Sequence, residues 1–442
     1  MPPGTDVPSG PRASSGFGSA ILFSLVFAYF WITLAPLADE SAASLALPWA
    51  GNSNLVNQIV VVTMAAALLA AIWNRPARKL LLQPRMLLVL MLAWFSLVSM
   101  IGHDPASAFR RIVFAVLVCF SASAMLLLPR SETQFARLLS IGVLLALALS
   151  YFGVVALPGR AIHQASDTLE TALAGQWRGH FGHKNTASAA MVIIAFCGLY
   201  VMRTWSRGLG LLVVALAVVF LFKAGGKSAS AMLPLILTLA WLFERWRFLR
   251  APIAIGGPLG FNLLAVGAAV FEPIRNLVGG LGVDATFTNR ADVWRLAMQA
   301  IAEKPLTGYG FQVFWQTDTL RYGGGDVETW AVTASHSHNA YIEALINAGV
   351  PGLVFIVIWL LVLPIADVHR AEAGGNDPML TRLFIRIWLF SIYSSCLEST
   401  FFSNTGPLWF TMLLAVFGLR LQARASLVAA GAGHRREALA HA

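Results

Sequence analysis

Charged side chains are scarce in this sequence, and their scarcity excludes an ordinary water-soluble protein. Only 12% of the 442 residues are Asp, Glu, Lys or Arg, whereas soluble domains carry about 25%. Hydrophobic residues make up 57% of the chain, which is more apolar surface than a soluble chain of this length could keep from water. We therefore expect lipid to be the solvent for most of the chain.

Cysteine is also rare, and basic runs are absent. Cys119, Cys197 and Cys396 all fall inside apolar runs. Their spacing predicts neither a metal site nor a disulfide, so we interpret them as core or lipid-facing residues. The formal charge of +10 is not gathered into Lys/Arg runs with interleaved aromatics, which argues against nucleic acid as a partner. The cations stand mainly in short segments between apolar runs, which indicates membrane topology.

Long apolar runs account for most of the chain. Since a helical span needs about 20 mostly apolar residues, the sequence predicts an all-α polytopic membrane protein with about twelve transmembrane helices. The transmembrane domain is predicted over 17–422, after a disordered tail at 1–16 and before a basic tail at 423–442. The predicted spans are 17–38, 55–73, 86–102, 112–128, 138–157, 186–202, 209–224, 229–243, 252–271, 350–368, 384–402 and 407–422.

The distribution of Lys and Arg predicts the orientation. If the N-terminus is cytoplasmic, most of these cations fall in internal segments, although the external segments are longer overall. We expect an inner-membrane protein, and the positive-inside rule predicts that both of its termini lie in the cytoplasm.

Two segments on the predicted periplasmic side are too long to be simple turns, namely 158–185 and 272–349. The second is expected to fold as a cap, because 289–303 reads as an amphipathic helix with Asn289 as its N-cap. A further short helix is expected from Ser337 or His338 to Asn347, ended by Gly349 and Pro351. The residues that share the apolar face of the first helix are Val293, Trp294, Ala297 and Ile301.

Several cations stand where external segments enter the membrane: Arg178, Lys184, Lys227 and Arg290. One interpretation is interfacial snorkelling, which is common. The other is that they converge on a polyanionic group such as a diphosphate, since Arg binds phosphate through a planar fork and Lys as a point charge. The helix starts near Lys184 and Lys227 would add backbone N–H groups.

The pair His336 and His338 lies at the start of the second predicted loop helix. The positive end of that helix favours neutral imidazole, and a neutral histidine near phosphate suits a general base for a sugar hydroxyl. The alternatives are a metal pair, which no carboxylate or cysteine pattern completes, and two polar residues that cap a helix. Glu398, expected toward the external end of the eleventh span, is predicted to pair with an external cation.

Four motifs now carry a family resemblance: Arg178-Gly-His-Phe-Gly-His-Lys-Asn185; Gly225-Gly-Lys-Ser228; Asn289-Arg-Ala-Asp-Val-Trp294 leading to Pro305-Leu-Thr-Gly-Tyr-Gly310; and His338-Asn339 before Gly349-Val-Pro-Gly352. In this order and at these positions between spans, they resemble the O-antigen ligase and Wzy-type polymerase superfamily. The forms FGHKN and GKS look most like its exopolysaccharide polymerase branch, the ExoQ type. The resemblance covers about residues 170–400.

The resemblance implies a metal-independent, cofactor-free, inverting glycosyltransferase of the GT-C kind. Its donor would be a glycan on undecaprenyl diphosphate at the periplasmic face, and its acceptor a second glycan; a flippase and a chain-length regulator are further candidate partners. Lys227 stands where many relatives have arginine, which keeps the charge but loses the bidentate geometry. The implied roles are catalysis for His338 and Arg290, diphosphate binding for Lys227, Arg178 and Lys184, and support for His336, Asn339 and Glu398.

Three functions stay open at this point. A polymerase that joins lipid-linked repeats is favoured by the motif forms, and a ligase that transfers the glycan to lipid A core differs from it only in the acceptor. A polysaccharide or lipid transporter is the alternative from another class, but the midplane runs lack charged residues and no internal repeat is visible. Whether Asp326 or Glu328 assists His338 is also left open.

Overall fold

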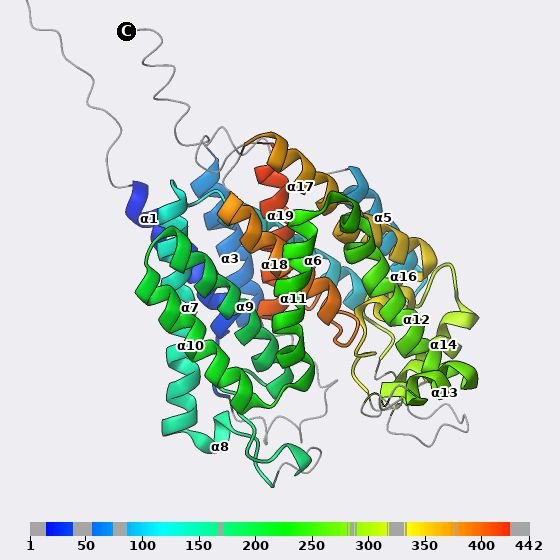
Figure 1. The fold of residues 1–442 in the computed structure, drawn as a ribbon. Helices are drawn as coiled ribbons and strands as arrows, with labels where there is room; N and C mark the ends of the chain where they lie inside the picture. Colours follow the sequence, from blue (N-terminus) through cyan, green and yellow to red (C-terminus); the bar gives the residue numbers. More distant parts are fainter. Residues whose placement is uncertain are drawn as a thin grey trace, which may run out of the picture.

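The protein is built from α-helices that run through a single bundle (Figure 1). The computed structural model describes residues 15–38, 55–73, 86–166, 171–280, 282, 287, 290–315, 317, 331, 334–375 and 378–424. Within these ranges no strand occurs, and the sole β-type pairing is an isolated antiparallel bridge between Ile162 and Trp177. The predicted tails, apart from their innermost residues, lie outside the described residues, as do Asp326 and Glu328.

Each predicted span overlaps a helix of the structure. Seven described helical stretches are long and apolar enough to cross a membrane, and α1, α5 and α19 are shorter apolar helices. The all-α polytopic membrane fold is thereby confirmed. The helices at the predicted spans are α1 (Ser15–Ile32), α3 (Leu55–Ile72), α5 (Met86–Met100), α6 (Pro105–Met125), α7 (Glu132–Ala156), α9 (Lys184–Thr204), α10 (Arg207–Ala224), α11 (Lys227–Arg245), α12 (Gly257–Val270), α16 (Ala340–Val357) with its continuation α17 (Leu363–Ala373), α18 (Pro378–Ser394) and α19 (Pro407–Gln422).

Shorter elements lie between these helices or extend them. Two follow α11, a 3-10 turn η2 (Arg247–Leu249) and a π-helical turn η3 (Pro252–Gly256) that leads into α12; a second π-helical turn, η5 (Ile358–Val362), joins α16 to α17. The remaining ones are α8 (Pro158–Ala161), η1 (Thr171–Leu173), α13 (Glu272–Gly280) and α14 (Arg290–Glu303).

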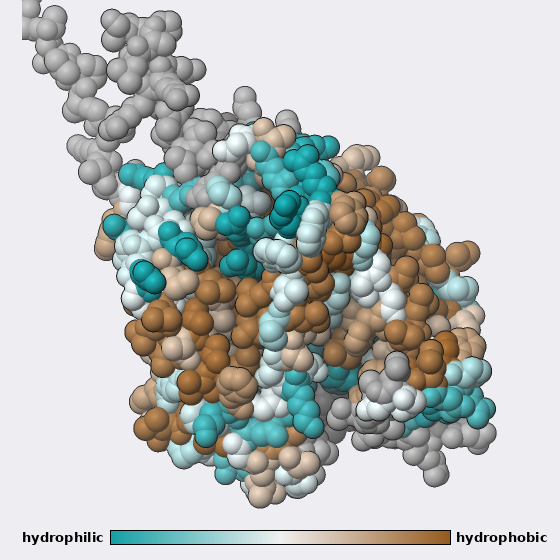
Figure 2. Space-filling view, viewed as in Figure 1, coloured by the Kyte–Doolittle hydropathy of each residue, from teal (hydrophilic) through white to brown (hydrophobic). Residues whose placement is uncertain are grey.

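The two ends of the bundle differ. α1 begins and α19 ends at one end, and α8, α13 and α14 lie at the other (Figure 1). Between the two ends of the bundle, Figure 2 shows a band of hydrophobic residues across the side of the molecule that is in view. On α3 the side chains of Leu55, Val56 and Ile59 are more than 60% exposed. A face of this kind is stable only against lipid.

The centre of the bundle is α9. Of its most apolar stretch 78% is buried, against 28% for α3, because α7, α10, α11, α18 and α19 all pack against it. Since α9 starts at Lys184, the motif that precedes it is held at one end of the most enclosed of the seven long spans. Cys197 on this helix is buried, Cys396 is buried after α18, Cys119 is half-buried, and all three are free thiols, as predicted.

The cap segment follows the prediction closely. α14 spans Arg290–Glu303, and the four residues expected on its apolar face are all buried. Asn289, its expected N-cap, lies outside the described residues. The second helix begins at Ala340 rather than at residue 337 or 338, because Asn339 is the N-cap: its Oδ1 accepts the N–H groups of Tyr341 and Ile342. α13 was not predicted; Arg275 from it donates to the carbonyls of Ala268 and Ala269 at the end of α12.

The eleventh span is shorter than predicted. α18 ends at Ser394 instead of continuing to residue 402. The reason is a long-range contact: the Ala340 N–H donates to the Ser395 carbonyl at 2.8 Å, and Asn339 Nδ2 donates to the Cys396 carbonyl at 3.0 Å. These polar groups from the start of α16 hold the chain in a turn. Glu398 consequently stands in a loop at the end of the bundle, beyond the span.

Gly349 interrupts α16 with φ 64° and ψ −169°, and we expect its replacement to be destabilising. A Cβ there would lie 2.2 Å from the Leu306 carbonyl oxygen, and a non-glycine residue with positive φ costs of order 1–3 kcal/mol before any clash. Gly349→Ala is expected to lower the thermal midpoint of the detergent-purified protein by several degrees. Gly375→Ala is the matched control, because Gly375 has φ +65° with nothing within 4 Å. Equal shifts for the two variants would contradict the packing argument.

Candidate active site

Glu398 joins three segments that are far apart in the sequence. Its Oε1 lies 2.8 Å from Arg290 Nη2 at the start of α14 and accepts from Asn185 Nδ2 at 3.2 Å. Its Oε2 lies 3.7 Å from His338 Nδ1, which is longer than a hydrogen bond. Burial acts to raise the pKa of Glu398, but the His338 imidazole and the Arg290 charge outweigh it and hold the pKa below its ordinary value. The side chain is therefore a carboxylate at neutral pH.

His338 is held in an unusual backbone conformation. Its φ of 52° lies in the left-handed region, which few non-glycine residues adopt and which costs free energy unless the surroundings fix it. Its N–H donates to His336 Nδ1 at 3.2 Å, while the next residue, Asn339, is fully buried and anchored to the Cys396 carbonyl and to Asn262 Oδ1. Hydrogen bonds of His338 and of the next residue thus stabilise the strained backbone conformation. His338 itself is 28% exposed.

The loop before His338 is fixed by two neighbouring helices. Trp294 Nε1 on α14 donates to the Ser337 carbonyl at 3.0 Å. Glu343 on α16 accepts from the Ser337 N–H at 3.0 Å and the Ser337 hydroxyl at 2.8 Å, and also from Trp315 Nε1. The arrangement couples the position of His338 to both helices of the cap.

His336 lies beside His338 and has a different character. The two imidazole ring centroids are 4.1 Å apart. Burial, with smaller contributions from the neighbouring cations and imidazoles, lowers the pKa of His336 to about 4. The His336 imidazole is therefore neutral at physiological pH, and its Nδ1 serves as a hydrogen-bond acceptor for the loop.

Lys227 opens α11 beside the same carboxylate. Gly225 ends α10 with φ 64°, and Gly226 precedes α11 without any side-chain cap. A Cβ at Gly226 would lie 2.2 Å from Ser188 Oγ, so only glycine allows this close approach. The first turn of α11 and Lys227 line a cavity together with Arg290, Asn185 and Glu398. Two cations and an uncapped helix N-terminus thus face one small space, an arrangement suited to a phosphate group.

A second cavity lies on the other side of Glu398. It shares Asn185 and Glu398 with the first and is also lined by His336, Ser399 and Thr400. Hydroxyl, imidazole and carboxylate groups dominate this lining, whereas the first cavity holds the cations. Glu398 therefore separates a cationic compartment from a polar one.

Arg178 and Lys184 are not among the residues that line the cavity beside Lys227. Arg178 is buried, and its Nε donates to the Arg160 carbonyl at 2.9 Å. It lines a third cavity with Arg160 and Thr186, which adjoins the polar compartment through Thr186. The Lys184 N–H donates to His163 Nε2 at 3.3 Å at the start of α9. The structure thus brings together Arg290, Lys227, Glu398 and His338, with Arg178 one cavity further along.

Three residues of this arrangement were not assigned from the sequence. Asn185 is the last residue of the motif that begins at Arg178, but its contact with Glu398 spans 213 positions of the chain. Trp294 was expected only as an apolar face residue. Glu343 gave a usable signal, an ionisable residue at the edge of an apolar run. Within the ranges that the structure describes, no three His, Cys, Asp or Glu side chains are grouped as a metal site.

These features define a class: a polytopic membrane protein with a cation, histidine and carboxylate cluster at one end of its bundle. The O-antigen ligase family model matches residues 212–357, a range that includes Lys227, Arg290 and His338. The chain is also similar to the "Exopolysaccharide production protein ExoQ" of Rhizobium meliloti (strain 1021), with 26% identity over 145 residues, 29% of this chain and 32% of the relative. The match thus spans about a third of that relative's length. Both matches confirm the predicted resemblance to the O-antigen ligase and Wzy-type polymerase superfamily.

Proposed function

We propose that this protein is an inverting, metal-independent glycosyltransferase that polymerises glycan repeats carried on undecaprenyl diphosphate, in exopolysaccharide or O-antigen synthesis. The observation that supports this most is the contact set of Glu398, which links Arg290 to His338 beside Lys227. Arg290 lies at one oxygen of this carboxylate and His338 near the other, so the group that would bind phosphate and the group that would act as base share one partner. The family match and the ExoQ relative point to the same class of reaction.

The donor diphosphate would occupy the cavity lined by Lys227, Arg290 and the first turn of α11. As the bond between the anomeric carbon and the phosphate oxygen breaks, its electron pair passes to the diphosphate. Arg290, Lys227 and the uncapped N–H groups of α11 would stabilise that charge more strongly than the charge of the bound donor. Arg178 and Lys184 would attract the donor from the adjoining positions.

The acceptor sugar would enter the polar compartment beside His336 and Ser399. Its hydroxyl oxygen forms the new bond to the anomeric carbon on the face opposite the diphosphate, which inverts the configuration. The hydroxyl proton passes to the Nε2 atom of His338, while Glu398 near Nδ1 orients the ring and stabilises the imidazolium. His336 and Asn339 would hold the loop that carries the base.

The site would face the periplasm of the bacterial inner membrane, with both termini in the cytoplasm. The positive-inside distribution supports this orientation. The structure is consistent with it, since α1 begins and α19 ends at the end of the bundle opposite the cap (Figure 1). A flippase would supply the lipid-linked repeat from the cytoplasmic side, and a chain-length regulator would act on the product.

Ligation to lipid A core is the second candidate, favoured by the description of the matching family as O-antigen ligase. The assay is the purified protein incubated with a synthetic undecaprenyl-diphosphate repeat, with and without lipid A core. A ladder of lengthened products from the repeat alone is expected for the polymerase. Product that forms only with lipid A core would identify the ligase, and no transfer to either acceptor would contradict both.

A further inference from the structure

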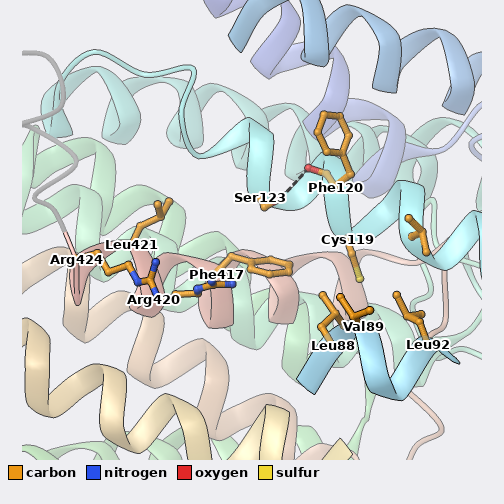
Figure 3. A pocket seen from close by; sticks show the side chains of 11 residues that line it. Leu88, Val89, Leu92, Cys119, Phe120, Ser123, Phe417, Arg420, Leu421 and Arg424 are labelled. Carbon is orange, nitrogen blue, oxygen red and sulfur yellow. Dashed lines mark hydrogen bonds between the residues drawn. The ribbon is translucent and has the colours of Figure 1, made fainter. Parts of the chain in front are cut away.

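A separate cavity lies at the end of the bundle opposite the candidate active site. It is a slot of about 220 Å³ between α5, α6 and α19. Figure 3 shows Arg420 and Arg424 together at one end of it, Leu88, Val89 and Leu92 at the other, and the Phe417 ring between them. We call this the α5–α6–α19 slot; its lining residues are Leu88, Val89, Leu92, Val116, Cys119, Phe120, Ser123, Phe417, Arg420, Leu421 and Arg424.

The walls of the slot are hydrocarbon and open toward the membrane. Val89 and Val116 stand on its α5 and α6 sides and are 44% and 41% exposed. Both residues belong to apolar helices, so the medium they face is lipid. The hydroxyl of Ser123 donates to the Phe120 carbonyl of its own helix and adds little polarity to the wall. A lipid acyl chain can therefore reach the slot sideways from the bilayer.

The charged end of the slot selects the kind of lipid. Arg420 lies in the last turn of α19, Arg424 lies two residues beyond the end of that helix, and none of the lining residues is acidic. Guanidinium groups bind phosphate oxygens through paired hydrogen bonds, and basic pockets between transmembrane helices bind anionic lipid headgroups. We propose that the α5–α6–α19 slot binds one anionic phospholipid, with an acyl chain along the Leu88 and Phe417 wall and the phosphate at Arg420 and Arg424.

Such a lipid would act on the helix that reaches the other end of the bundle. α19 runs from Pro407 to Gln422, and Pro407 lines the polar compartment that contains His336 and Glu398. A lipid that holds the α19 end at Arg420 against α5 and α6 therefore restrains a helix whose first residue borders the candidate site. We expect bound anionic lipid to raise the thermal midpoint of the protein.

The test is native mass spectrometry of the full-length, detergent-purified protein titrated with phosphatidylglycerol or with phosphatidylethanolamine. One phosphatidylglycerol is expected to bind about tenfold more tightly than phosphatidylethanolamine, and Arg420→Gln/Arg424→Gln is expected to remove that preference. The matched control is Arg203→Gln/Arg207→Gln, which removes two exposed cations from the same end of the bundle without touching the slot. Val89→Trp fills the slot with both arginines intact and should also abolish the tight adduct.

Each outcome bears on the proposal. Equal binding of the two lipids, or equal losses in the slot variants and the control pair, would overturn it and indicate general surface charge. Competition by glycerol phosphate as strong as by the whole lipid would show a headgroup site only and contradict the acyl-chain slot. If the double arginine variant fails to fold, Val89→Trp decides, because Val89 lines the slot and is 44% exposed, so the larger side chain does not have to enter the packed core. Undiminished binding to this variant would also overturn the proposal.

Discussion

Replacing His338 with alanine is expected to reduce glycan transfer by about 10²- to 10⁴-fold, the usual contribution of a positioned general base. The acceptor hydroxyl is a weak nucleophile until its proton is removed, and His338 is the partly exposed imidazole that faces the Glu398 carboxylate. The protein should still fold, because the contacts that hold the loop are made by Ser337 and Asn339. Turnover of a synthetic lipid-linked repeat by purified protein measures the effect.

Two further variants separate the base from its neighbours. His336→Asn can keep the acceptor for the His338 N–H and is expected to retain most of the activity, since the pKa of about 4 leaves His336 neutral. Glu398→Gln removes the charge that stabilises the imidazolium, so its turnover should lie between those of His336→Asn and His338→Ala. If His338→Ala retained wild-type turnover at equal protein levels, the proposed role of His338 would be wrong.

The helices could be predicted from the sequence because the signals for them are local. Apolar runs of about 20 residues mark the spans, and some boundaries carry a capping residue such as Ser131 or Ser206. The end of α18 could not be predicted in this way. It depends on Asn339 and Ala340, more than 50 positions away, which bind the carbonyls that a longer helix would have used.

The residue types of the candidate site could be predicted from the sequence, but which of these residues lie together could not. Arg290 and His338 were named from their motifs, and the structure places both against Glu398. That Glu398 would stand between two compartments depends on the early end of α18, so no local pattern indicated it. Arg178 was expected beside Lys227, yet the turn held by the Arg160 carbonyl places it in the adjoining cavity.

Replacing Arg290 with alanine is expected to reduce turnover by about 10²- to 10³-fold, the usual loss when one stabilising donor is removed from a developing anion. Arg290→Lys keeps the charge but not the planar fork and should recover only part of the activity. Lys227→Ala is expected to cost less than Arg290→Ala, because the N–H groups of α11 remain. Arg295→Gln is the matched control, since Arg295 lies on the same helix, 47% exposed and paired with Asp292.

The ion pair with Glu398 complicates Arg290→Ala, because the substitution leaves a partly buried carboxylate without its cation. The double variant Arg290→Ala/Glu398→Gln resolves this, since it removes both charges together. If Arg290 acts on the diphosphate, the double variant is expected to be at least as inactive as Arg290→Ala, because nothing replaces the lost donor. If Arg290 only neutralises Glu398, Glu398→Gln should rescue Arg290→Ala toward the activity of Glu398→Gln alone. Rescue of that kind would remove Arg290 from the proposed diphosphate site and leave Lys227 and the first turn of α11 to bind the leaving group.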